Sequence, residues 1–76
     1  SWSIFSQITC LSRIGLMADV SVQLAAMKVN INEISSRETK DGRSQISMTI
    51  TVSNVDHLKN VIAGLKKVDG VLSVER

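Results

Sequence analysis

Apolar and polar residues alternate at the start of the chain, and this period of two predicts a strand with one buried face. Its inward positions are Trp2, Ile4, Ile8 and Cys10. Phe5 points to the opposite face, and Gly15 then permits a tight turn. The period changes after this glycine, which predicts a helix that ends near Lys28. The apolar residues at helical spacing are Leu16, Val20, Leu24 and Met27.

A second strand is predicted over residues 29–39, although its alternation is imperfect. Val29 and Ile31 share one phase, and Ile34 does not. One extra residue in the strand would restore the phase, so we expect a β-bulge near Asn32 or Glu33.

An Asp-Gly pair follows this strand and predicts a hairpin. Asp41 and Gly42 suit a type I′ turn, which needs a positive φ at both central residues. The strand after the turn has the clearest alternation in the chain. Its inward positions are Ile46, Met48, Ile50 and Val52, and its outward positions are Ser47, Thr49 and Thr51.

A second amphipathic helix is predicted to begin after Ser53 or Asn54, either of which can cap it. Asp69 and Gly70 end this helix, and residues 71–74 predict a short final strand. The apolar stripe of the helix consists of Leu58, Val61, Ile62, Leu65 and Val68.

The predicted elements follow the order strand, helix, strand, strand, helix, strand. Right-handed crossovers then place both helices on one face of a four-stranded antiparallel sheet. The expected fold is therefore an α+β ferredoxin-like sandwich with βαββαβ topology. Its other face, which would carry Phe5 and the outward serine and threonines of the third strand, is polar enough to meet water.

The length of the chain sets its organisation. Its 76 residues allow a single domain over residues 1–76, and a monomer of this size is marginally stable. Hydrophobic residues make up 43%, which excludes disorder, and no apolar run approaches the roughly 18 residues of a membrane helix. Because the chain starts at Ser1 without a leader pattern, we expect a fragment of a longer cytoplasmic protein with no membrane contact.

Residue types argue against an enzyme and against a metal or cofactor site. His57 is the only histidine, it is expected on the solvent side of its helix, and no nucleophile with an orienting carboxylate accompanies it. Cys10 is the only cysteine, and one thiolate makes no metal site, so a buried apolar role is expected. The basic residues are scattered and the net charge is only +2, which is unlike a dedicated nucleic-acid binder.

The turn between the first strand and the first helix is the best candidate for binding. The amides from Gly15 to Ala18 open a helix, so they are free to donate and carry partial positive charge. Asn30, at the start of the adjacent strand, offers a donor and an acceptor. A small amino acid would suit such a site. The plainer alternative is that Gly15 only makes the turn and Asn30 only ends the helix.

Three segments together resemble the ACT domain over nearly the whole chain: Ser12-Arg13-Ile14-Gly15-Leu16-Met17-Ala18-Asp19-Val20, then Val29-Asn30-Ile31, then Gly70-Val71-x-x-Val74. Ser36-Arg37 and the closing residues 65–76 are more similar to the C-terminal ACT domain of RelA/SpoT-type enzymes, the GTP pyrophosphokinases that make and degrade the alarmone (p)ppGpp.

The resemblance implies a non-catalytic regulatory domain. ACT domains commonly pair as homodimers with effectors at the interface, and the C-terminal domains of this family relay amino-acid starvation through contacts with other domains, the ribosome and tRNA. The ligand-binding positions that the resemblance implies are Ser12, Arg13, Ile14, Gly15, Leu16, Met17, Ala18, Asn30 and Ile31. Ser12 stands where the family usually has Asp or Asn, and Ile14 where many members have Pro.

The leading expectation is thus an ACT domain that controls an alarmone synthetase or hydrolase by dimerisation, by interdomain or ribosomal contact, and by amino-acid sensing. One alternative is an amino-acid-binding ACT module of a metabolic enzyme. The other is a domain that contacts rRNA and binds no small molecule.

Overall fold

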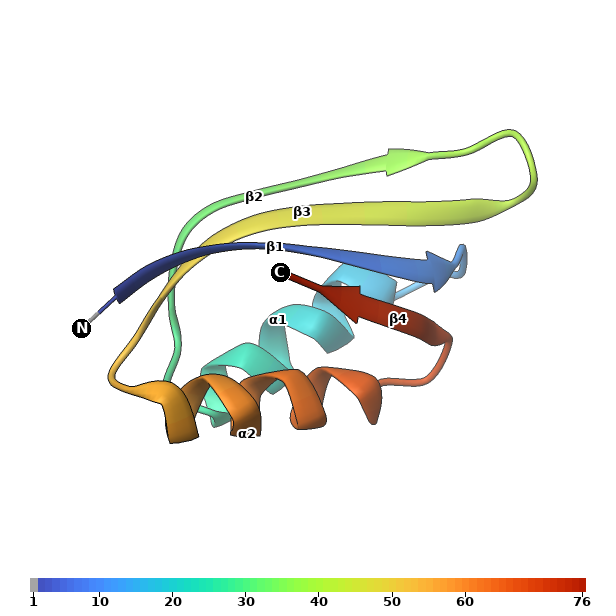
Figure 1. The fold of residues 1–76 in the computed structure, drawn as a ribbon. Helices are drawn as coiled ribbons and strands as arrows, with labels where there is room; N and C mark the ends of the chain where they lie inside the picture. Colours follow the sequence, from blue (N-terminus) through green and yellow to red (C-terminus); the bar gives the residue numbers. More distant parts are fainter. Residues whose placement is uncertain (1) are drawn as a thin grey trace.

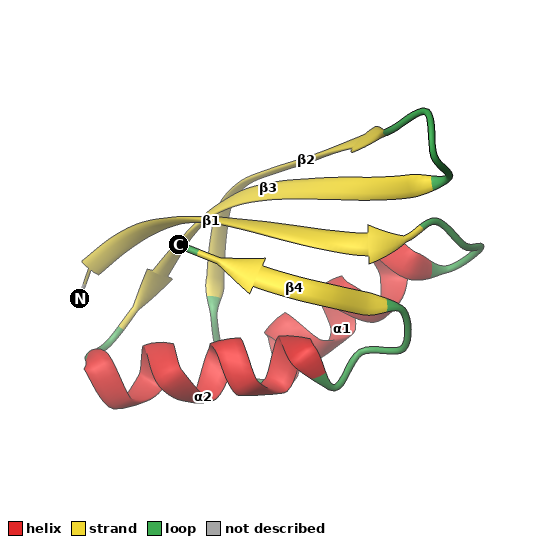
Figure 2. Cartoon of the chain, turned by 45° about the vertical axis from the view of Figure 1, so that its right-hand side comes forward, coloured by secondary structure: helices red, strands yellow, loops and turns green. Residues whose placement is uncertain are grey.

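The computed structural model describes residues 2–76, and its elements follow the predicted order (Figure 1). They are β1 (Trp2–Leu11), α1 (Leu16–Ala26), β2 (Asn30–Glu38), β3 (Arg43–Val52), α2 (Val55–Lys66) and β4 (Val71–Glu75). The four strands form one antiparallel sheet in the order β2-β3-β1-β4, so β2 and β4 are its edges. Both helices lie on the same side of this sheet (Figure 2), which confirms the ferredoxin-like prediction. Neither helix is long and apolar enough to cross a membrane.

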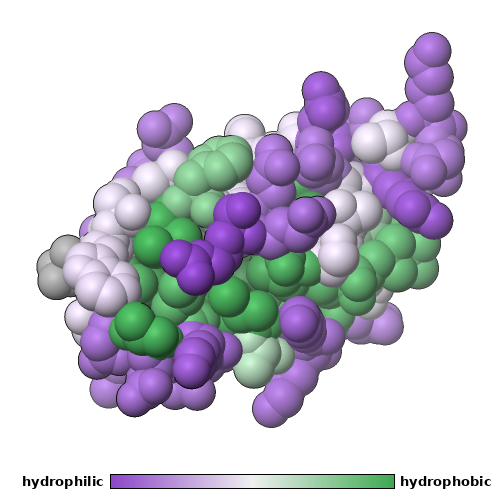
Figure 3. Space-filling model, in the orientation of Figure 1, coloured by the Kyte–Doolittle hydropathy of each residue, from purple (hydrophilic) through white to green (hydrophobic). Residues whose placement is uncertain are grey.

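The core lies between the sheet and the helices. Its fully buried strand residues include Ile8 and Cys10 of β1 and Ile46 of β3, which occupy the predicted inward positions. Trp2 shares their phase and pairs with Val52, yet it is 50% exposed because it stands at the free start of β1. The helices contribute Leu16, Val20, Leu24, Leu58, Val61 and Leu65 to the same core. Hydrophobic surface shows between sheet and helices on the side of β4, whereas polar side chains cover the hairpin end (Figure 3).

The second strand contains the predicted bulge. The β2–β3 register shifts between Ile31 and Glu33, which leaves Asn32 unpaired. The Asn32 side chain compensates, because its Nδ2 donates to Thr51 Oγ1 at 3.1 Å. The bulge puts Ile31 and Ile34 on the same face, where both pack against the core.

The hairpin between β2 and β3 does not have the predicted type I′ turn. Gly42 has φ 77°, but Asp41 does not have a positive φ. Instead the Thr39 carbonyl accepts from the Gly42 amide at 3.3 Å, and the Thr39 amide donates to the Arg43 carbonyl at 2.8 Å. This is a type I turn followed by a left-handed glycine, so the loop is one residue longer than the Asp-Gly pair suggests.

The start of α2 confirms one prediction and corrects another. Asn54 is the N-cap, and its Oδ1 accepts from the His57 amide at 2.8 Å. The prediction that His57 faces solvent is wrong, because its ring is half-buried and bonded on both sides. Nδ1 accepts from the Ser53 amide at 2.9 Å, and Nε2 lies 2.9 Å from the Met27 carbonyl. Since Nδ1 accepts a bond from an N–H group, the proton must be on Nε2, which donates to Met27.

Candidate functional site

The turn between β1 and α1 is fixed by its neighbours on both sides. The Leu11 amide donates to the Gly70 carbonyl at 2.8 Å, and the Ser12 amide donates to the Gly42 carbonyl at 3.1 Å. The turn therefore lies at the same end of the sheet as the β2–β3 hairpin (Figure 1). These contacts connect residues that are about 30 and 60 positions apart along the chain.

Helix α1 begins without a side-chain cap. Its N-cap is Gly15, with φ 80°, and no side chain forms a capping hydrogen bond there. The Asp19 amide bonds to the Gly15 carbonyl at 2.9 Å, whereas the amides of Met17 and Ala18 have no partner among the described residues. Free amides at a helix N-terminus carry partial positive charge and suit an anionic group. This part of the predicted site is therefore available for binding.

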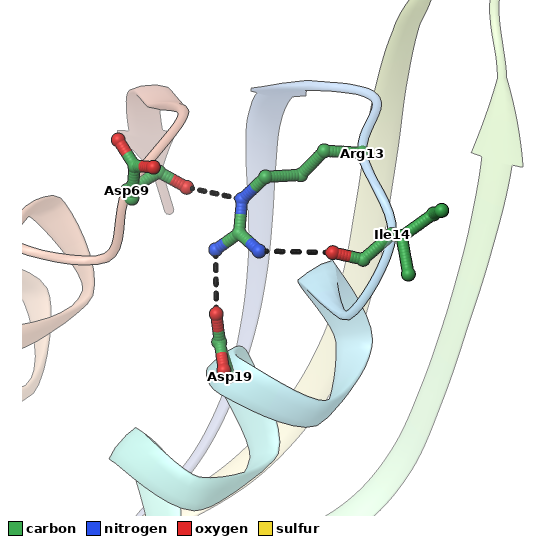
Figure 4. Close-up of polar contacts among 4 residues, drawn as sticks. All are labelled: Arg13, Ile14, Asp19 and Asp69. Carbon is green, nitrogen blue, oxygen red and sulfur yellow. Dashed lines mark hydrogen bonds and ion pairs between the residues drawn. The ribbon is translucent and has the colours of Figure 1, made fainter.

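Arg13 lines the site, but its guanidinium already forms hydrogen bonds within the chain (Figure 4). Nε donates to the Asp69 carbonyl at 3.0 Å, Nη1 to the Ile14 carbonyl at 3.1 Å, and Nη2 to Asp19 Oδ2 at 2.7 Å. These bonds connect the β1–α1 turn with the α2–β4 loop. Arg13 is thus a structural link between two loops.

A hollow of about 250 Å³ opens beside the free amides. Its walls are Ser12, Arg13, Gly15, Leu16, Met17 and Ala18 from the predicted set, with Ser36, Glu38 and Ser44 added from the hairpin strands. Ser12 Oγ donates to Glu38 Oε1 at 3.1 Å. Ser44 is only 7% exposed, and no buried side-chain nitrogen or oxygen among the described residues lacks a hydrogen-bond partner. A signal for Ser44 exists in the sequence, because it shares the inward phase of Ile46.

The structure does not bring the other predicted residues to this hollow. Ile14 lies at the tip of the turn, where its side chain is fully exposed and points away from the guanidinium of Arg13 (Figure 4). Asn30 and Ile31 lie at the start of β2, at the opposite end of the sheet from Glu38. Eight steps of about 3.3 Å each separate Asn30 from Glu38 along the strand, a distance of about 26 Å. Within one chain, Asn30 therefore cannot complete the site.

Cys10 lies on the helix-facing side of the sheet and packs in the core, as expected. It is fully buried. Burial raises the pKa of its thiol, and the nearby charge of Arg13 opposes that rise. A buried thiol with a raised pKa is a poor nucleophile and a poor metal ligand.

Comparison with known proteins shows the family of the chain. The ACT domain family matches residues 6–76. The chain is 33% identical to GTP pyrophosphokinase of Escherichia coli over 76 residues, which is 99% of this chain and 10% of that protein. It is 37% identical to GTP pyrophosphokinase of Haemophilus influenzae over 65 residues, 84% of this chain and 9% of that protein. The chain thus spans about a tenth of the length of these relatives.

A solved structure has the same fold over almost its whole length. The ACT domain from GTP pyrophosphokinase of Chlorobium tepidum superposes with a TM-score of 0.84, covering 99% of this chain and 96% of that one, at 28% identity. The family match and the βαββαβ topology both identify an ACT domain. The chain belongs to the ACT domain family, and its similarity is to the ACT domains of GTP pyrophosphokinases.

Proposed function

We propose that this ACT domain is a non-catalytic regulatory module of a GTP pyrophosphokinase-like enzyme, which pairs with a second copy and responds to a small amino acid. The relatives support the proposal that this domain belongs to a larger enzyme, because the GTP pyrophosphokinases that match are about ten times longer than this chain. The observation that supports ligand binding is the hollow at the start of α1, where two amides of the first helical turn lack partners among the described residues.

The edge strand β2 supports pairing of two copies. It is nine residues long, most of its residues are exposed, and nothing in residues 2–76 covers its outer edge. A long unpaired edge is a template for another strand. Antiparallel pairing of two β2 strands would join the sheets into one of eight strands and keep all helices on one side. The added burial would also stabilise a small domain.

This pairing would also bring the separated site residues together. In an antiparallel pair, the start of one strand lies beside the end of the other. The segment that contains Asn30 of the partner subunit would then lie near Glu38 and the hollow. Each of the two sites would be built from both copies, so that ligand binding and pairing strengthen each other.

Calorimetry with the twenty amino acids tests the ligand. We expect at least one of them to bind, and Asn30→Ala to weaken that binding. Asn60→Ala is the matched control, because it removes an exposed carboxamide from α2. If none of the twenty amino acids binds, amino-acid sensing is contradicted. If Asn30→Ala binds the ligand as tightly as the wild type, Asn30 is not part of the site.

Sedimentation in a dilution series tests the pairing. We expect a dimer that dissociates on dilution, and a weaker dimer for Ser35→Lys, because a lysine in the middle of an exposed edge strand disfavours pairing with another strand. Ser21→Lys places the same charge on the exposed face of α1 and serves as the control. A strict monomer at millimolar concentration would overturn the proposed pairing.

A further inference from the structure

Met27 connects the two helices through its side chain and its backbone. It is the C-cap residue of α1, and its sulfur lies so close to Gly64 of α2 that a carbon added to this glycine would overlap it. Its carbonyl accepts the Nε2 hydrogen of His57, which lies in the first turn of α2. The side chain packs against the core but stays partly exposed. A partly exposed thioether therefore lies in the contact between α1 and α2.

The other oxidisable side chains differ from Met27 in exposure or in location. Met48 of β3 is 1% exposed and Cys10 is fully buried, so a dissolved oxidant does not reach either sulfur. The raised pKa of the Cys10 thiol also keeps it out of the reactive thiolate form. Met17 is partly exposed, but it lines the hollow at the start of α1. Trp2 is half exposed at the free start of β1. Oxidation of Met27 therefore has a consequence that is specific to the helix contact.

We propose that Met27 is an oxidation site, at which a peroxide converts the thioether to methionine sulfoxide and so loosens the contact between α1 and α2. In this step the sulfur uses a lone pair to take one oxygen of hydrogen peroxide, the O–O bond breaks, and the other oxygen leaves as water with both protons. The sulfur is oxidised and the peroxide is reduced. Methionine sulfoxide reductases reverse the change. The inference depends neither on the proposed ligand nor on the pairing of two copies.

The sulfoxide does not fit the place of the thioether. Its S=O group is polar, and packing this group between two helices would cost it the hydrogen bonds that water supplies. The side that faces Gly64 has no room for even one added carbon, so Met27 must withdraw from α2 to keep the oxygen in solvent. Withdrawal removes its apolar contacts with the core and leaves a cavity beside Gly64. Oxidation thus acts like a large-to-small substitution in the helix contact.

Peroxide treatment of the 76-residue chain tests the proposal. Peptide mass spectrometry locates each added oxygen, and thermal unfolding follows stability. Two variants separate the partly exposed methionines, because Met17→Leu keeps Met27 and Met27→Leu keeps Met17, and leucine has a similar volume but forms no sulfoxide. As Met27 of the Met17→Leu chain gains oxygen, we expect its Tm to fall by about 4–8 °C, the shift typical of one destabilising substitution in a domain of this size. The same treatment should change the Tm of Met27→Leu by less than about 2 °C.

Repair of the oxidised chain identifies the sulfoxide as the cause. Reductases that act on both sulfoxide epimers should restore the Tm, which damage to Trp2 or Cys10 would not allow. Circular dichroism before treatment checks that both variants fold, and the wild-type chain with this repair step replaces a variant that does not.

Four results would overturn the proposal. Met27 gains oxygen no faster than the buried Met48, or its oxidation leaves the Tm unchanged. Alternatively, Met27→Leu loses as much stability under peroxide as Met17→Leu does, or the reductases remove the oxygen without restoring the Tm.

Discussion

Gly64 of α2 lies directly against Met27 at the end of α1, so that a β-carbon on Gly64 would overlap the Met27 sulfur. The same added carbon would lie 3.1 Å from Nε2 of Gln23, which donates to the Gly64 carbonyl at 2.9 Å. The two helices therefore approach each other at a position where only the absence of a side chain allows it. Although α2 would gain helix propensity from an alanine here, packing sets the choice of residue.

Gly64→Ala should destabilise the fold by about 1 kcal/mol, because the strain of moving Met27 exceeds the gain in helix propensity. In a Met27→Ala background only the flexible end of Gln23 lies close to the added carbon, and the same substitution should stabilise by about 0.5–1 kcal/mol. Urea unfolding of the four proteins in this cycle measures the coupling. A stabilising Gly64→Ala in the wild-type background would contradict the contact.

Asn54→Ala should lower the free energy of unfolding by about 1 kcal/mol, because it removes the hydrogen bond that Asn54 Oδ1 accepts from the His57 amide. Ser53→Ala is the control, since Ser53 contributes only its backbone amide to this region and should change stability by less than about 0.5 kcal/mol. Urea denaturation of both variants gives the comparison. A larger loss for Ser53→Ala would mean that the cap is assigned to the wrong residue.

Arg13→Ala should cost about 1–2 kcal/mol of stability, because it frees the Asp69 and Ile14 carbonyls as well as the Asp19 carboxylate. Asp19→Asn should cost less than about 0.5 kcal/mol, because it alters only a partly exposed ion pair. Urea unfolding of the two variants separates these roles. Equal losses would show that the ion pair, and not the link between the loops, is what Arg13 contributes.

The buried Cys10 predicts a loss of stability in alkaline solution. Burial raises the pKa of its thiol in the folded state, so the folded protein holds this proton more tightly than the unfolded chain. The resulting stability is complete below about pH 8.5, the ordinary value, and is lost as the pH rises through the higher folded-state pKa. Urea unfolding between pH 7.5 and pH 10 should show this fall, and Cys10→Ala should flatten it. A wild-type curve that parallels the Cys10→Ala curve would contradict the account.

Local patterns in the sequence predict most of this fold. The alternation around Ile46, the cap at Asn54 and the phase break near Asn32 each depend on neighbours within a few residues. The prediction of a type I′ turn is wrong because an Asp-Gly pair fits both a two-residue and a three-residue loop. The register of the flanking strands decides between these loops. Only the pairing of Glu38 with Ser44 settles that register.

The sequence predicts only one of the two walls of the hollow. The glycine turn and the free amides of α1 are local features, and Gly15 indicates both. The opposite wall comes from Ser36, Glu38 and Ser44, which lie about twenty to thirty residues further along the chain and reach the turn only through the hairpin between β2 and β3. The role of His57 escaped prediction for the same reason, because its partner Met27 is thirty residues away. Contacts of this kind have no periodicity that a single sequence could display.

The central claim is that one hollow, formed by the start of α1 and completed by β2 of the partner subunit, binds a small amino acid. The most direct measurement is a titration of the isotope-labelled chain with the tightest amino acid of the calorimetric panel, followed by amide resonances in NMR. We predict that the resonances of Gly15 to Ala18 and of Asn30 shift together, with one dissociation constant that tightens as protein concentration rises. Shifts confined to other parts of the chain, or none at saturating amino acid, would contradict the account.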